Sequence, residues 1–153
     1  MATLLIPLFV LLGVYQVVYS GDAPIPYDAS SVWATARHDK RFPVLQPNGL
    51  PAHWTVISAT YRDATLRVGY ITPAGTGLQL VESDQTAEQL LPAELGATAR
   101  PGNLLVIGDR QWRDYPDARN GDHALVLVEQ GRTIVVIGGV EGADLRTFAG
   151  TLR

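Results

Sequence analysis

Residues 54–83 read WTVISATYRDATLRVGYITPAGTGLQLVES, and this stretch decides the fold class. It holds three runs that are rich in β-branched and aromatic residues, at 54–61, 65–72 and 78–83. Such runs predict β-strands, because these side chains pack well on a pleated surface. The linker 62–64 has room only for a tight reversal of the chain, so we expect the first two strands to form an antiparallel hairpin.

The rest of the chain adds strands and helices around this unit. Further strand patterns, separated by Gly-containing turns, lie at 104–107, 111–115, 124–129 and 133–138. Helical patterns with capping residues or an apolar face lie at 28–39, 84–95 and 141–152. This order predicts an α+β domain in which two or three helices pack on a mainly antiparallel sheet.

Composition limits the function classes. A chain of 153 residues has the length of one domain. Its 12 Lys and Arg against 15 Asp and Glu give a net charge of −3, which argues against nucleic-acid binding. The chain has no cysteine, which excludes disulfides, thiolate zinc sites and cysteine nucleophiles.

The N-terminal segment has a different character from the rest. Residues 4–18 read LLIPLFVLLGVYQVV, and the first charged residue is Asp22. As a helix, residues 3–19 would span about 26 Å, close to the roughly 30 Å of a bilayer core. We therefore predict a transmembrane anchor at residues 1–20. Its membrane-facing side chains would be Leu4, Leu5, Ile6, Leu8, Phe9, Val10, Leu11, Leu12, Val14, Tyr15, Val17, Val18 and Tyr19.

Two other interpretations of this segment stay open. A cleaved signal peptide would explain Val18-Tyr19-Ser20 before Gly21, which resembles a cleavage site, but the basic start is missing. A buried core helix would normally show one polar stripe, which is absent. With an anchor, residues 21–27 form a Pro- and Gly-containing tether. Residues 28–153 then form a domain on the extracytoplasmic side of the cell membrane, because only a short tail precedes the apolar run.

No catalytic or metal-binding motif stands out. His38, His53 and His123 lack the spacing that places two metal ligands on one face, so we predict no metal and no cofactor. Asp122-His123 resembles half of a proton relay, but no Gly-x-Ser-x-Gly nucleophile elbow accompanies it.

Two residue sets remain as candidates for binding or chemistry. Glu82 and Asp84 are separated by one residue, so they could face together from a strand end, although such pairs are more often solvated turn residues. Aromatic residues mostly fill cores, but those near the tether are better candidates for an interface. The candidate interface comprises Tyr27, Trp33, His53 and Trp54.

Several short motifs together resemble one protein family. They are Pro43-Val44 through Pro47, Leu50-Pro51-Ala52-His53-Trp54, 68–73, Gly108 with Trp112, 133–138 and 145–152. Their order is similar to that in an uncharacterised family of actinobacterial envelope proteins, which have one transmembrane helix and an extracytoplasmic domain of unknown function. Two features depart from that family: the basic stretch before the anchor is missing, and His53 replaces a glycine. The resemblance implies location and topology and carries no site residue. At the fold level the pattern is similar to that of the Mog1/PsbP-like accessory proteins.

These observations favour an accessory protein over an enzyme. We expect a non-catalytic, membrane-anchored subunit whose domain docks on a larger integral membrane complex, such as a respiratory supercomplex or a transporter. One alternative is a module that binds a lipid or another small ligand in an apolar pocket. A third is an enzyme whose residues come together only in the folded domain.

Overall fold

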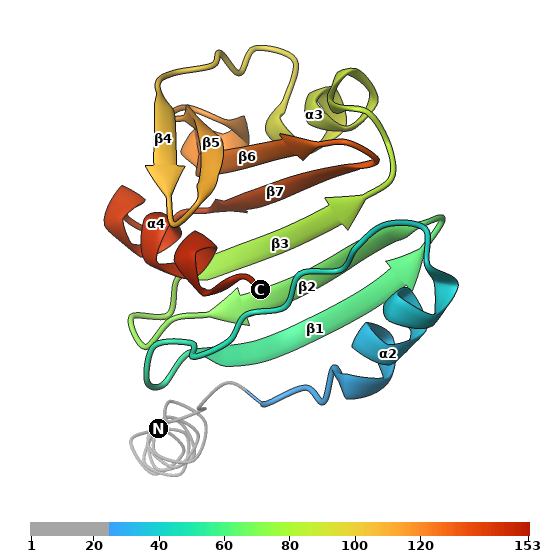
Figure 1. Cartoon of the computed structure of the whole chain (residues 1–153). Coiled ribbons are helices and arrows are strands. Elements are labelled where there is room, and N and C mark those ends of the chain that lie inside the picture. Colours follow the sequence, from blue (N-terminus) through green and yellow to red (C-terminus); the bar gives the residue numbers. More distant parts are fainter. Residues whose placement is uncertain (1–24) are drawn as a thin grey trace, which may run out of the picture.

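The structure is a computed structural model that describes residues 25–153. The predicted anchor at 1–20 and most of the tether lie outside the described residues. Within residues 25–153, no helix is long and apolar enough to cross a membrane. The elements, labelled as in Figure 1, are α2 (Ser30–Asp39), β1 (Thr55–Arg62), β2 (Thr65–Ile71), β3 (Gly77–Ser83), α3 (Ala87–Leu95), β4 (Leu104–Ile107), β5 (Arg110–Tyr115), the 3₁₀ turn η2 (Arg119–Gly121), β6 (His123–Glu129), β7 (Arg132–Gly138) and α4 (Gly142–Thr151).

The described strands form one sheet in the order β1-β2-β3-β7-β6-β5-β4, and all neighbours are antiparallel. Two meanders, β1 to β3 and β4 to β7, join edge to edge where β3 pairs with β7. Every residue of β7 is buried, because this central strand is covered on both faces. The predicted α+β class, with two or three helices on a mainly antiparallel sheet, is therefore confirmed for the described domain, in which three α-helices pack on the sheet.

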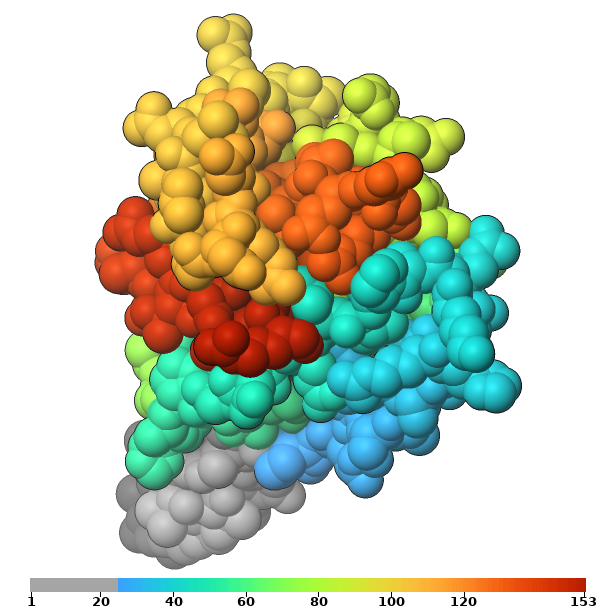
Figure 2. Space-filling model, in the orientation of Figure 1, coloured from blue at the N-terminus to red at the C-terminus, as the bar shows by residue number. Residues whose placement is uncertain are grey.

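The first face of the sheet carries the larger core. Helices α2 and α4 cover it together with an extended segment, residues 42–51, which we call the crossing segment (Figures 1 and 2). Three prolines keep this segment out of regular structure. Its middle is tied to the end of the chain, because the backbone N–H of Gln46 donates to the carbonyl of Arg153 (3.0 Å) and the N–H of Arg153 donates back (3.1 Å).

The second face carries a smaller core beneath α3. Leu90 and Leu95 of this helix belong to the same apolar cluster as Val81, Val126 and Val135 of the sheet. An ion pair between Arg67 of β2 and the buried Glu94 also ties α3 to the sheet. Since α3 packs mainly over the centre of the sheet, the β1 and β2 part of this face is polar and open, with Thr60 and Arg62 lining a surface hollow.

Candidate functional site

Glu82 is the most unusual polar residue of the described domain. It lies on β3, has no exposed surface, and sits on the first face beneath the crossing segment. Its Oε1 accepts a hydrogen bond from the backbone N–H of Leu45 (2.9 Å), while its Oε2 has no partner among the described residues. Burial raises the pKa of Glu82 to about 8, although the Leu45 N–H and the charges of Arg132 and Arg37 act in the opposite direction.

Two arginines hold the crossing segment beside Glu82. Arg132 of β7 is 7% exposed, and its guanidinium donates to the carbonyl oxygen of Pro43 and to the carboxylate of Glu129. Arg41, which precedes the crossing segment, donates to Asp84 at the end of β3 through Nη2 (2.8 Å) and Nε (3.2 Å). Each arginine therefore fastens the start of this segment to the sheet.

Glu82 and Asp84 share one face of the chain, as their spacing allowed, but they bind the protein's own backbone and side chains. Glu82 binds Leu45 and Asp84 binds Arg41, so the two carboxylates fix two neighbouring points of one segment. Glu82 is fully buried and so has no access to a substrate, whereas the side chain of Asp84 is 25% exposed and is held by Arg41. We therefore assign this cluster to the attachment of the crossing segment.

The second ionisable cluster joins β5 to β6 near the start of α4. His123 contacts Asp114 through Nε2 and Oδ1, so its partner is Asp114 and not the neighbouring Asp122. The imidazole packs on Gly142, the first residue of α4, where an added Cβ would lie 3.0 Å from Cε1 of His123. Glycine at this position therefore leaves room for the ring.

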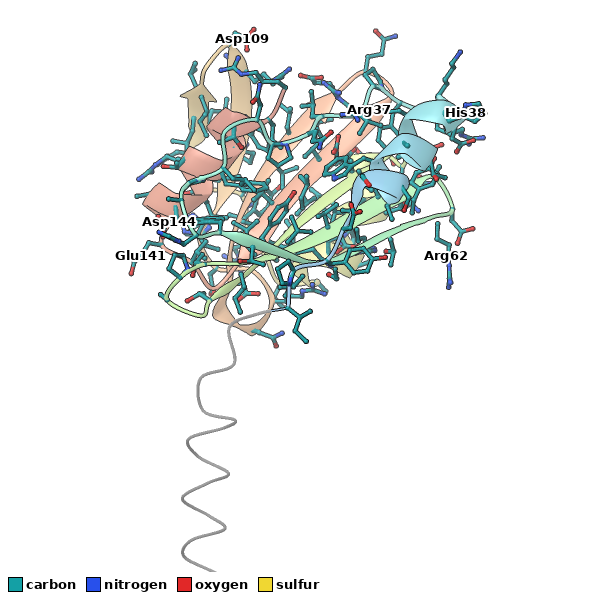
Figure 3. The ribbon with its side chains drawn as sticks, turned by 90° about the horizontal axis from the view of Figure 1, so that it is seen from below. Arg37, His38, Arg62, Asp109, Glu141 and Asp144 are labelled. Carbon is teal, nitrogen blue, oxygen red and sulfur yellow. The ribbon has the colours of Figure 1, made fainter. Side chains whose placement is uncertain are left out.

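The histidines do not converge on a metal site. Within residues 25–153 no three His, Asp or Glu side chains are grouped so that they could hold a metal ion. His38 lies on α2, at the opposite end of Figure 3 from Glu141 and Asp144, which flank the start of α4 where His123 packs. His53 lies in the loop before β1 and is exposed.

The structure divides the four candidate interface residues into two pairs. Tyr27 and His53 form the exposed pair: Tyr27 is 45% exposed, and His53 is also exposed. The backbone of His53 is in the left-handed region, with a φ of 67°. Trp33 is 5% exposed and belongs to the core beneath α2. Trp54 is partly buried and stacks on Phe148 of α4, with 6.0 Å between the ring centroids.

Three exposed apolar side chains lie where the described chain begins. Ile25 is 86% exposed and Ile57 is 40% exposed. The two are close to Tyr27, because the backbone N–H of Tyr27 donates to the carbonyl of Val56 (2.8 Å) and thereby docks this stretch on the edge of β1. We call Ile25, Tyr27 and Ile57 the β1 patch. Figure 1 shows the chain entering the domain alongside β1.

A separate apolar hollow lies on the second face, between the C-terminal end of α3 and the loop that leads to β4. Its volume is about 300 Å³. Its lining consists of small apolar residues, prolines and one tyrosine: Leu91, Pro92, Leu95, Gly96, Ala97, Ala99, Pro101 and Tyr115.

Comparison with known families gives one result for the whole chain. The family model described as "Protein of unknown function (DUF4245)" matches residues 1–152. The chain belongs to the DUF4245 family. No curated protein and no solved structure matches it, so the fold-level similarity of this DUF4245 protein to the Mog1/PsbP-like proteins stays a prediction.

Two residues of the β1 patch in this DUF4245 protein were missed by the sequence reasoning. Ile57 follows Val56 directly, and this pair breaks the apolar-polar alternation of the strand. The break coincides with an irregularity in the β1–β2 register between Val56 and Ser58, which places Ile57 at the surface. Ile25 stands between two prolines, a position in which extended backbone leaves the side chain uncovered.

Proposed function

We propose that this DUF4245 protein is a membrane-anchored accessory subunit of the cell envelope. Its N-terminal segment crosses the membrane once, and its domain on the extracytoplasmic side docks through the β1 patch on an integral membrane protein. A larger assembly such as a respiratory supercomplex or a transporter is the kind of partner we infer. The role is binding and not catalysis.

The position of the β1 patch carries this proposal. Ile25, with 86% of its surface exposed, follows the proposed anchor by only five residues. Five extended residues reach at most about 18 Å, so the patch stays close to the membrane surface. A tethered domain has a high effective concentration toward membrane partners, and a small apolar contact therefore suffices for occupancy.

The charges along the segment that carries Ile25 and Tyr27 favour a protein partner over lipid headgroups. Residues 21–36 contain no Lys or Arg, and they contain Asp22 and Asp28. Recognition of anionic lipids depends on clustered Lys and Arg near the membrane. Exposed apolar side chains with few charges are instead typical of the centre of protein interfaces.

The internal polar contacts support binding over catalysis. Glu82, Asp84, Arg132 and Asp114 each contact a partner within the described domain, and these contacts connect separate elements. These contacts attach the crossing segment to the sheet and join β5 to β6.

The anchor can be tested by deletion. We expect the full chain to sediment with membranes and to resist alkaline carbonate extraction, because residues 4–18 are apolar. Deletion of residues 1–20 is expected to move the protein almost entirely into the soluble fraction. Intact-mass measurement of the membrane-bound protein provides the control, since a mature chain that starts at Gly21 would contradict a retained anchor.

Docking can be tested by crosslinking in native membranes followed by affinity capture in mild detergent. The test variant is Ile25→Ser/Tyr27→Ser/Ile57→Ser. The matched control is Val128→Ser on β6, because Val128 is also exposed (59%) but belongs to a different strand. We expect one integral membrane protein to be recovered with the natural chain and the control, and lost with the test variant. Recovery of lipid alone, or equal recovery by all three chains, would overturn the proposal.

The apolar hollow beside α3 favours a second candidate function, the binding of a small apolar ligand. Its volume of about 300 Å³ and its apolar, Tyr115-containing wall are suited to a short acyl or aromatic group. Native mass spectrometry of the protein extracted from its membranes tests this function. A bound small molecule that is lost in Ala99→Trp, which would fill the hollow, would support it over docking.

A further inference from the structure

Strand β4 forms one outer edge of the sheet, and its side chains are unusual for that position. The strand reads Leu104-Leu105-Val106-Ile107, without a charge or a proline. Leu104 is 55% exposed and Val106 is 70% exposed. Edge strands of monomeric proteins normally carry charges, prolines or bulges that prevent pairing with another chain. The strand β4 is short, with four residues, but within residues 104–107 it carries no charge, no proline and no bulge.

The pairing of β4 with β5 shows which backbone groups face outward. A two-residue turn makes Ile107 and Arg110 opposite residues, and the N–H of Asp114 donates to the carbonyl of Asn103 (2.9 Å). Because hydrogen-bonded positions alternate along an antiparallel pair, Leu105 and Ile107 direct their backbone groups toward β5, as the carbonyl of Asn103 does. Leu104 and Val106 therefore direct two N–H and two C=O groups away from the sheet.

We propose that this edge pairs with the same edge of a second copy of the chain. In the antiparallel register that we infer, Leu104 lies opposite Val106 of the other copy, and Leu105 lies opposite its own equivalent on the two-fold axis. All four outward groups of each copy then find partners, which gives four hydrogen bonds across the axis. The arrangement is isologous and closed, as in most dimers.

Side-chain direction supports this register. Opposite residues in a continuous sheet point to the same face, and Leu104 and Val106 share the face that also carries Val126. The pairing would thus bring two leucines and two valines together and remove their exposed surface from water. A register shifted by one residue would set the outward groups of Leu104 and Val106 opposite residues whose groups face β5, and these hydrogen bonds would be lost. A shift of two residues would pair only one of the two exposed side chains of each copy with its equivalent, so the register we infer brings the most apolar surface together.

The residues beside the strand fit a second copy of the same chain. Glycines lie near both ends of the strand, Gly102 before it and Gly108 directly after it, so neither contributes a side chain that would obstruct a second copy. Arg100 of one copy and Asp109 of the other are brought to the same end, and their charges are opposite. Figure 3 shows Asp109 at the tip of the β4–β5 turn, clear of the rest of the domain. This self-complementarity is why we choose a second copy over an unrelated peptide.

The oligomeric state of the full chain in mild detergent tests the proposal, by light scattering with the detergent contribution subtracted. We expect twice the mass of one chain for the natural protein and for Val128→Lys, and the mass of one chain for Val106→Lys. The two variants make the same exchange of an exposed valine for lysine on the same face, but only Val106 is at the edge. Circular dichroism confirms that each variant is folded.

A crosslink tests the register independently. The chain has no cysteine, so Leu105→Cys introduces a single thiol. On the two-fold axis the two Cα atoms would be about 4.5 Å apart, within the range that a disulfide spans. We expect rapid oxidation to a covalent dimer, and none for Val128→Cys. A monomeric natural chain, a dimer that survives Val106→Lys, or the absence of the Leu105→Cys crosslink would overturn the proposal.

Discussion

Replacement of Phe148 by alanine is expected to lower the free energy of unfolding by about 3–5 kcal/mol. Phe148 has no exposed surface and is the central contact of α4 with the first face of the sheet. Its ring stacks on Trp54 at a centroid distance of 6.0 Å and meets the edge of Tyr70 at 4.9 Å. Alanine would leave a cavity between α4, Trp54 and Tyr70, because the surrounding backbone relaxes only in part.

Urea denaturation of the full chain in mild detergent measures this loss, with tryptophan fluorescence as the signal. Trp54 reports directly, since its ring touches the substituted position. Thr147→Ala is the matched control, because Thr147 precedes Phe148 on α4 but is exposed. The control is expected to stay within about 0.5 kcal/mol of the natural protein. A loss below about 1 kcal/mol for Phe148→Ala would show that α4 contributes little to the core.

The stability of the protein is expected to fall as the pH rises from about 4.5 to about 8, because of Glu82. Burial raises the pKa of this carboxyl from 4.5 to about 8 in the folded chain. Between these values the folded state binds the proton and the unfolded state does not, so raising the pH favours unfolding. The slope from this one group is at most about 1.4 kcal/mol per pH unit. Below pH 4.5 both states are protonated, and the effect disappears.

The variant Glu82→Gln isolates this effect, because glutamine resembles the protonated acid and keeps the acceptor for the Leu45 N–H. We expect the difference in unfolding free energy between variant and natural protein to grow in favour of the variant from pH 5 to pH 8. Glu88→Gln on the exposed side of α3 serves as the control and should show a constant difference. Parallel pH curves for Glu82→Gln and the natural protein would refute the raised pKa.

Local patterns predicted the elements, because each depends on neighbouring residues. The runs at 65–72 and 133–138 became β2 and β7, and the helical pattern at 141–152 became α4, which buries Leu145, Phe148 and Ala149. The alternation within β3 also holds a signal for Glu82, since it shares a face with the buried Leu78 and Leu80. The sequence did not show what covers that face.

Only the tertiary structure decided the strand order and the surroundings of the charged residues. Pairing of β3 with β7 joins residues 50–60 positions apart, and no local preference selects that partner over another strand. The burial of Glu82 depends on the crossing segment, which reaches β3 from 37 residues earlier in the chain through Leu45. Likewise, His123 bonds to Asp114 on the adjacent strand, although Asp122 is its neighbour in sequence. The sequence by itself therefore determined the α+β class, the elements and the apolar N-terminal segment, because periodicity and chain composition are local. Which residues meet depends on long-range packing, and this decided which charges are buried, which aromatic residues are exposed, and which strand edge is free to pair.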